Sequence, residues 1–170
     1  IVRSPFAPHH AKSKGFMINE TLRLTSGRWI VLLDADIALP PDFFKRLDAV
    51  SSRAVFVAPE GRKMLGPEAT ARILIGETRT WEDYEALLQT EGEVRRSEAL
   101  GGTPIGFCQC VRREVFDQEP YPEFDHFEGA DWFFGKAIVD RHGPETRLEG
   151  MDVLHLDHGG SQWYGTQKHR

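Results

Sequence analysis

Residues Trp29–Pro41 read WIVLLDADIALPP, and this stretch indicates the class of the fold. Five apolar residues, Trp29–Leu33, run directly into the acidic pair Asp34 and Asp36. A short apolar run bounded by polar residues and prolines predicts a buried strand of a parallel sheet. Because ligands of open α/β sheets bind beyond the carboxyl ends of the strands, the two aspartates stand where a ligand is expected.

The two aspartates are separated by one residue, and their carboxylates repel each other unless a cation lies between them or one keeps a proton. A hard divalent ion that also carries phosphate oxygens is the natural partner of such a pair. A solvated acidic turn after a strand has the same sequence. Both interpretations therefore stay open on this motif alone.

Length and composition limit the class of protein. With 170 residues, 40% of them apolar, the chain is long enough for one domain with a substantial core, which we place at residues 1–170. A net charge of -5 argues against general binding to a phosphate backbone, so no nucleic-acid partner is expected. We expect neither a signal peptide nor a membrane span, because no apolar run approaches the roughly 20 residues that a span needs.

Cys108 and Cys110 are the only cysteines and lie on one face of a predicted strand. In that arrangement they are badly placed to bridge each other, and a zinc site would need a second pair that the sequence lacks. We expect buried free thiols, which suit a reducing compartment and a cytoplasmic location.

The rest of the chain is predicted to alternate between helices and strands, and Asp131 falls in the first turn of one helix. A carboxylate there caps the helix or points into a cleft, and the sequence leaves both roles open. Helices are predicted at Ala11–Leu24, after Pro40-Pro41, at Glu82–Thr90 and from Gly129 to Gly143, and a short helix or turn at Arg112–Phe116. Strands are predicted at Ala54–Ala58, Ile105–Val111 and Met151–Leu156.

Two histidines mark the end of the last predicted strand. His155 and His158 are candidate metal ligands, because the chain already offers a carboxylate pair for the same ion. The tail at 159–167, GGSQWYGTQ, combines the glycines of a mobile loop with the aromatics of a lid, so Trp163 is a candidate ligand contact. Lys12, near the start of the first helix, could meet a pyrophosphate or could be a solvated surface lysine.

The order of these parts resembles the family 2 glycosyltransferases and their relatives of the GT-A fold. The likeness is best over Ala11–Phe44, where a lysine-containing helix with Asn19 leads to G-x-W-I-V-L-L-D-A-D-I-x-L-P-P-D-F. A looser likeness runs through Gly101–Ile138 to His158, with a glycine pair, an apolar strand, an Arg-Arg pair, an acidic helix start and late histidines. The resemblance implies a partial GT-A α/β fold, with a mostly parallel central sheet and flanking helices.

The resemblance also implies an activity, the transfer of a sugar from a nucleotide-diphospho-sugar to an acceptor hydroxyl with Mn²⁺ or Mg²⁺. A UDP-sugar is the expected donor, and a glycan or another hydroxyl compound the acceptor. Asp36 matches the metal-binding aspartate of the family, and Asp34 matches the one near the ribose and the metal. His155 and His158 both match the late histidine that the family supplies to the metal.

The remaining matched residues concern the donor and the acceptor. Asp131 matches the second acid of the family's Glu-Asp pair, the candidate base, and direct attack assisted by one base predicts inversion at the anomeric carbon. Ala130 replaces the usual glutamate, and Glu128 lies slightly upstream as a second candidate. Gly102 falls where the family passes backbone near the donor sugar.

One departure from the family is large. The family places a nucleotide-binding half before the acidic motif, whereas only Ile1–Leu33 precede Asp34 here. We therefore expect a chain that is truncated at its N-terminal side relative to the family. Missing strands would leave an exposed sheet edge, through which a homodimer could form.

Two other functions fit parts of the sequence. A phosphatase of the haloacid dehalogenase type also follows a strand with DxD, and would use Asp34 as nucleophile and Asp36 as acid. Ala38 stands where such enzymes carry threonine or valine, and the prolines that follow fit glycosyltransferases better. A glycosyltransferase-like module that binds without turnover is the non-enzymatic alternative, supported by Ala130 and the short N-terminal part.

Overall fold

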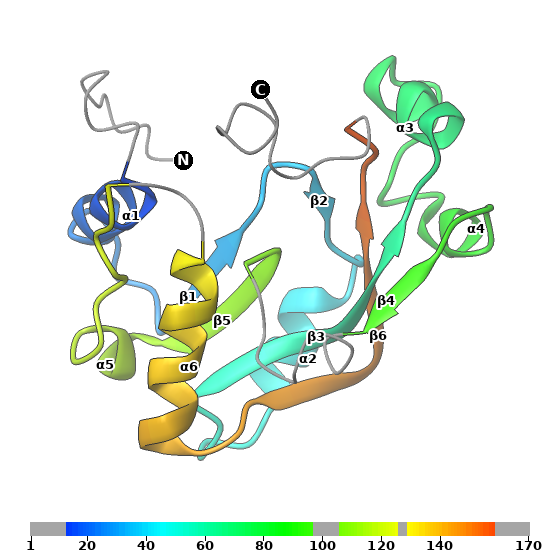
Figure 1. Cartoon of the computed structure of the whole chain (residues 1–170). Coiled ribbons are helices and arrows are strands. Elements are labelled where there is room, and N and C mark those ends of the chain that lie inside the picture. The colour runs from blue at the N-terminus through cyan, green and yellow to red at the C-terminus, as the bar shows by residue number, and fades with distance from the viewer. Residues whose placement is uncertain (1–12, 97–105, 126–128, 159–170) are drawn as a thin grey trace. The chain divides into compact units, whose positions relative to one another are not determined.

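The structure is a computed structural model that describes residues 13–96, 106–125 and 129–158, and it has an α/β fold with a central sheet and flanking helices (Figure 1). The expected α/β class, with a central sheet and flanking helices, is thereby confirmed. In chain order the elements are α1 (Lys14–Leu22), β1 (Trp29–Leu33), β2 (Ile37–Ala38), α2 (Phe43–Ala49), β3 (Phe56–Met64), α3 (Pro67–Leu74), α4 (Tyr84–Leu88), β4 (Val94–Arg96), β5 (Cys108–Arg112), α5 (Arg113–Phe116), α6 (Ala130–His142) and β6 (Thr146–His155).

The chain divides into two compact units, and each is described separately. The first unit comprises Ile1–Leu33, Val50–Ala58 and Ser97–Arg147, and the second comprises Asp34–Ala49, Pro59–Arg96 and Leu148–Arg170. The strand order is β1-β5-β3 in the first unit and β3-β6-β2, with β4 paired to β3, in the second. Strands β3 and β6 each contribute residues to both units.

The first unit is built around β5, whose five residues are all buried. It pairs antiparallel with β1, from Trp29 opposite Arg112 to Leu33 opposite Cys108, and with the start of β3. The predicted bounds of β1 are confirmed, but only Ile30 in that strand is buried and Leu33 is 41% exposed. Cys108 and Cys110 are buried and free, as expected.

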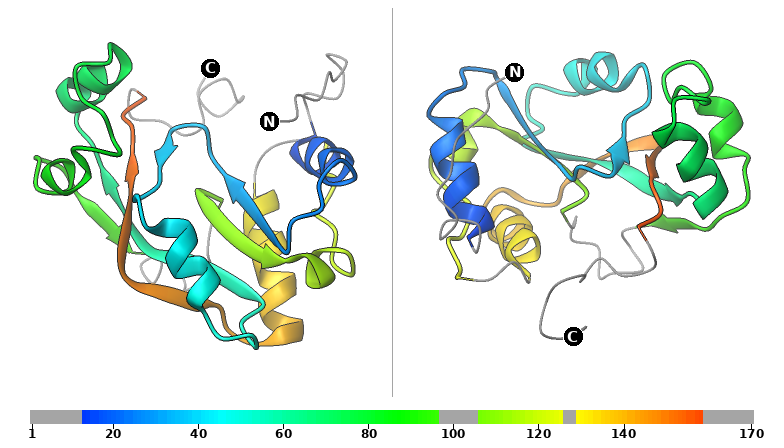
Figure 2. Two further views of the ribbon diagram at one scale, coloured as in Figure 1. Left: turned by 180° about the vertical axis from the view of Figure 1, so that it is seen from behind. Right: turned by 90° about the horizontal axis from the view of Figure 1, so that it is seen from above.

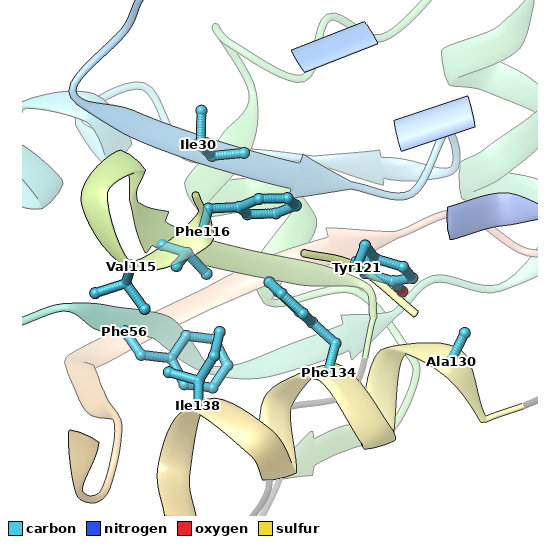
Figure 3. Packing of buried hydrophobic residues seen from close by; sticks show 9 residues of the cluster. Ile30, Phe56, Val115, Phe116, Tyr121, Ala130, Phe134 and Ile138 are labelled. Carbon is cyan, nitrogen blue, oxygen red and sulfur yellow. The ribbon is translucent and has the colours of Figure 1, made fainter. Parts of the chain in front are cut away.

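Side chains from β1, β3, β5, α5 and α6 form the core of the first unit (Figure 3). Phe134 and Ile138 lie one turn apart on α6, and each is at most 1% exposed. Burying side chains of this size contributes about 1.5–3 kcal/mol each. The cluster consists of Ile30, Phe56, Val111, Val115, Phe116, Tyr121, Ala130, Phe134 and Ile138.

The second unit has a smaller core, in which α3 and α4 lie next to each other beside the end of β6 (Figure 2). Leu65, Tyr84, Leu87 and Leu154 are its buried members. The Tyr84 hydroxyl donates a 2.7 Å hydrogen bond to the carbonyl of Asp152, and burial raises the pKa of this phenol well above its usual range. The contact ties α4 to β6.

The expectation of a mostly parallel sheet needs correction. The four strand pairs with a defined register, β1–β5, β2–β6, β3–β4 and β3–β5, are all antiparallel. An apolar run such as Trp29–Leu33 indicates that the strand packs against a core. It does not indicate whether the paired strand runs parallel or antiparallel to it. Strand β3 also extends past the predicted end at Ala58, through Pro59 and Gly61, because β4 pairs with its second half.

None of the helices in the described part of the chain has both the length and the apolar character needed to cross a lipid bilayer.

Candidate metal centre

The acidic pair lies in a tight turn between β1 and β2. The amide of Ile37 donates a 3.2 Å hydrogen bond to the carbonyl of Asp34, which closes the turn over Ala35 and Asp36. Asp36 therefore stands immediately before β2, and its backbone position is set by the start of that strand.

The register between β2 and β6 brings Asp36 to the end of the last strand. Ile37 lies opposite His155, and the amide of Leu156 donates a 2.8 Å hydrogen bond to the carbonyl of Asp36. The carbonyl of His155 accepts a 2.9 Å hydrogen bond from the amide of Leu65. The backbone around His155 is thus held from both sides.

Asp36, His155 and His158 form a three-residue cluster of potential metal ligands within the second unit. One carboxylate oxygen of Asp36, Oδ2, lies 3.6 Å from Nε2 of each histidine, and the three donor atoms all lie within 4.8 Å of one another. Ligand atoms that surround one ion at about 2.1 Å are themselves roughly 3–4 Å apart. The two distances from Asp36 Oδ2 fall within this range, as a divalent ion shared between Asp36 and either histidine requires.

The His155 ring is oriented by its other nitrogen. Nδ1 lies 2.9 Å from the carbonyl oxygen of Leu156, and because a carbonyl only accepts, Nδ1 carries the proton. Burial lowers the pKa of His155, although the Asp36 carboxylate opposes the shift; the charges of Arg62 and His158 add to it. In the neutral ring Nε2 then presents a lone pair on the side of Asp36.

The two oxygens of the Asp36 carboxylate have different surroundings. Its Oδ1 atom is buried and, among the described residues, has no hydrogen-bond partner. Its Oδ2 atom faces two imidazole nitrogens at distances too long for hydrogen bonds. A buried acceptor without a donor is costly, so a cation or a proton bound at this carboxylate would be stabilising.

The residue before His158 is held by α3, a helix that the sequence did not predict. The amide of the preceding residue, Asp157, donates a 2.8 Å hydrogen bond to the hydroxyl of Thr70, a buried residue of α3. The signal for this helix was present in the sequence, because Pro67 follows Gly66 and Glu68 stands in the first turn.

Asp131 belongs to the first unit and lies in the first turn of α6, as predicted. Its Oδ2 atom accepts a 2.6 Å hydrogen bond from the amide of Gly106, and its Oδ1 atom accepts one of 2.9 Å from the amide of Trp132. A Cβ atom at position 106 would lie 2.7 Å from Asp131 Oδ2, so only glycine allows this approach.

The other predicted site residues divide into two groups. Asp34 lies in the same turn as Asp36 but is not a member of the ligand cluster found among the described residues. Lys12, Gly102, Glu128 and Trp163 lie outside the described residues.

Exposed aromatic residues beside Asp131 are a feature that the sequence did not reveal. Trp132 is 38% and Phe133 53% exposed, whereas Phe134 is buried. Phe133 makes edge-to-face contacts with Trp132 and Phe124, at 5.0 and 5.5 Å between ring centroids. Phe134 and Ile138 are one helical turn apart and face the core. Their spacing in the sequence indicates that the rings of Trp132 and Phe133 lie away from the core.

No protein-family model matches the sequence, and no curated protein matches it. Among solved structures, the chain is similar to a glucosyl-3-phosphoglycerate synthase from Mycobacterium tuberculosis in complex with phosphoglyceric acid, with a TM-score of 0.48 and 19% identity. The match covers 91% of this chain and 50% of that one, so the chain spans about half the length of that protein. A likeness at this level does not extend to activity.

Proposed function

We propose that this chain takes part in the metal-dependent transfer of a sugar from a nucleotide-diphospho-sugar to an acceptor hydroxyl. The observation that supports the proposal is the meeting of Asp36 with His155 and His158, which come from opposite ends of the chain. The family resemblance of the Asp34–Asp36 motif predicts such a meeting, and a solvated acidic turn does not require it.

The three side chains fit a divalent ion. A carboxylate and two imidazoles are common ligands of such ions, and the buried Oδ1 of Asp36 lacks any other partner among the described residues. When bound, Mn²⁺ or Mg²⁺ would act as a Lewis acid that neutralises the charge growing on the leaving diphosphate. We propose that Asp36, His155 and His158 hold the ion and that Asp34 lies near the ribose.

We propose Asp131 as the base that receives the proton of the acceptor hydroxyl. Each of its carboxylate oxygens accepts one backbone N–H bond, which fixes the group and leaves each oxygen a second lone pair. Direct attack with a single base inverts the anomeric centre. NMR of the product should show inversion, and a retained configuration would refute this role for Asp131.

The proposed contacts to donor and acceptor rest on the sequence alone. Lys12, Gly102 and Trp163 are proposed to contact the donor, a UDP-sugar in the first instance. Glu128 is proposed to replace the family glutamate, for which this chain has Ala130. Each of these roles is tested by its alanine variant, or by Gly102→Val, through the KM for donor or acceptor.

A module that binds a nucleotide-sugar without turnover is the second candidate. The hydrogen bonds of the Asp131 carboxylate favour it, because a capping residue at a helix start accepts the same kind of backbone bond. This candidate predicts Mn²⁺-dependent nucleotide binding with no hydrolysis of any UDP- or GDP-sugar by the folded chain.

The test is a thermal-shift panel of nucleotide diphosphates and their sugars, with and without Mn²⁺. Sugar transfer predicts that at least one nucleotide diphosphate raises the melting temperature, that the shift requires Mn²⁺, and that Asp36→Asn abolishes it. If no nucleotide shifts the melting temperature with Mn²⁺ present, or if Asp36→Asn responds like the unaltered chain, the proposal fails.

A further inference from the structure

The candidate metal centre offers two imidazole nitrogens and one carboxylate, a donor set that selects among ions. We infer that His155 and His158 bind the same ion as Asp36, that the ion is a first-row transition metal and not Mg²⁺, and that it binds before any nucleotide. This inference rests on the cation site of the proposed function. It adds the class of ion and the order of binding.

The choice of ion follows from the chemistry of the donors. Mg²⁺ prefers oxygen ligands in a near-octahedral arrangement and gives up its waters reluctantly. Imidazole favours ions such as Co²⁺ and Zn²⁺, and three protein ligands with open positions are the usual set of a catalytic transition-metal site. Replacing either nitrogen here by water would make the site more like one for Mg²⁺.

The geometry places both imidazoles against the same oxygen. Nε2 of His155 and Nε2 of His158 each lie 3.6 Å from Asp36 Oδ2, and their ring centroids are 5.2 Å apart at an interplanar angle of 57°. Neither ring has to leave the cluster for the other to bind. The sequence had offered the two histidines as alternatives, whereas the arrangement lets both act together.

The ligands are held in place by contacts of their own. The carbonyl of Leu156 fixes the His155 ring through Nδ1, and the hydroxyl of Thr70 fixes the residue before His158. Partners of this kind orient metal ligands and raise affinity. Because none of them comes from a nucleotide, the ion does not need one in order to bind.

The charge balance supports the same order. The Asp36 carboxylate carries one negative charge and a divalent ion carries two positive ones, so the loaded cluster is positive. A positive site attracts a diphosphate, whereas the carboxylate alone repels one. We expect the metal-loaded chain to be the form that accepts a nucleotide.

The test is calorimetry of the metal-free full chain with Mg²⁺, Mn²⁺, Co²⁺ and Zn²⁺, without nucleotide. We expect one Co²⁺ or Zn²⁺ per chain, bound at least 100-fold more tightly than Mg²⁺, with a visible absorption band for Co²⁺. His158→Ala should lower Co²⁺ affinity by roughly 10- to 100-fold and barely change that for Mg²⁺. His142→Ala, a matched change at an exposed histidine of α6, should leave Co²⁺ binding unchanged.

Several results would overturn the inference: Mg²⁺ binding as tight as Co²⁺ binding, or unchanged Co²⁺ affinity in His158→Ala. Ion binding that requires a nucleotide would also overturn it, while leaving the sugar-transfer proposal standing. Tight Co²⁺ binding, lost in His158→Ala, by a chain that binds no nucleotide would support the inference and refute sugar transfer. The two proposals can therefore fail separately.

Discussion

Two carboxylates predicted to be functional, Asp36 and Asp131, have opposite surroundings. Asp131 has a backbone N–H donor for each oxygen, from Gly106 and Trp132. Asp36 has no hydrogen-bond donor for its buried Oδ1 among the described residues, and its Oδ2 faces two imidazole nitrogens. Within the described residues, the backbone satisfies the first carboxylate, whereas the buried oxygen of the second lacks a donor.

The difference in surroundings distinguishes a carboxylate that stabilises the fold from one that binds a ligand. A carboxylate that the backbone satisfies contributes to stability whether or not a ligand is present. A carboxylate left without donors reduces the stability of the empty protein, and this cost is recovered only when a ligand binds. On this basis Asp36 is the stronger candidate for a ligand-binding residue, and Asp131 has a structural role in addition to its proposed chemical one.

The largest expected effect comes from Asp36→Asn, because it removes the only carboxylate of the ligand cluster. We expect Co²⁺ or Mn²⁺ affinity to fall by about 100-fold or more, since even indirect partners of metal ligands contribute 10- to 100-fold. Isothermal titration measures the change. Asp125→Asn, at an exposed aspartate, is the control and should bind as the unaltered chain does.

Asp131→Ala should destabilise the first unit by about 2 kcal/mol, because two backbone amides lose their acceptor. Urea unfolding measures the change. Metal affinity should be unaltered, since the ligand cluster lies in the second unit. Asp125→Ala should stay within about 0.5 kcal/mol of the unaltered chain. If Asp131→Ala is as stable as the unaltered chain, the backbone hydrogen bonds of Asp131 do not stabilise the fold, and the two carboxylates do not differ in this respect.

A pH effect is expected from His155 in the metal-free chain. Burial lowers the pKa of this ring in the folded state, so near pH 6 the unfolded chain binds more protons than the folded chain. Stability should therefore fall as the pH drops below about 6.5, by at most about 1.4 kcal/mol per pH unit, until the folded-state pKa is reached. Urea midpoints between pH 7.5 and 5 measure it.

Two variants sharpen this pH test. His155→Asn should flatten the acid slope, because the titrating ring is gone. Asp36→Asn should widen the pH window of the loss, because the Asp36 carboxylate is the charge that opposes the effect of burial. Stability that rises on acidification would show that His155 is charged in the folded chain.

The smallest expected effect is that of Thr70→Val, which removes the acceptor of the Asp157 amide. We expect a loss of about 1 kcal/mol in stability and of roughly tenfold in metal affinity, because His158 is held less firmly. Thr70→Ser keeps the hydroxyl and should restore both. Equal metal affinity in Thr70→Val and Thr70→Ser would mean that His158 needs no such support.

The sequence predicted local features well. The bounds of β1, the buried free cysteines and the position of Asp131 at a helix start all agree with the structure, because each depends on neighbouring residues. The carboxylate and imidazoles of the ligand cluster were identified by residue type and by their place at strand ends. Their proximity follows from strand pairing over a long sequence distance.

Features that depend on distant pairing were not predictable. The pairing of Ile37 with His155, which sets the cluster, has no local signature, and neither has the antiparallel direction of β5 beside β1. Thr70 was missed for another reason. Residues 61–99 were too charged to show a clear apolar period, although Gly66-Pro67 marked the start of α3.

The most direct test of the metal centre is anomalous X-ray diffraction from crystals of the chain soaked in Mn²⁺. An anomalous peak is expected roughly 2 Å from Asp36 and from Nε2 of both His155 and His158. A fully loaded crystal with its ion elsewhere, or with these three side chains unbound, would contradict it.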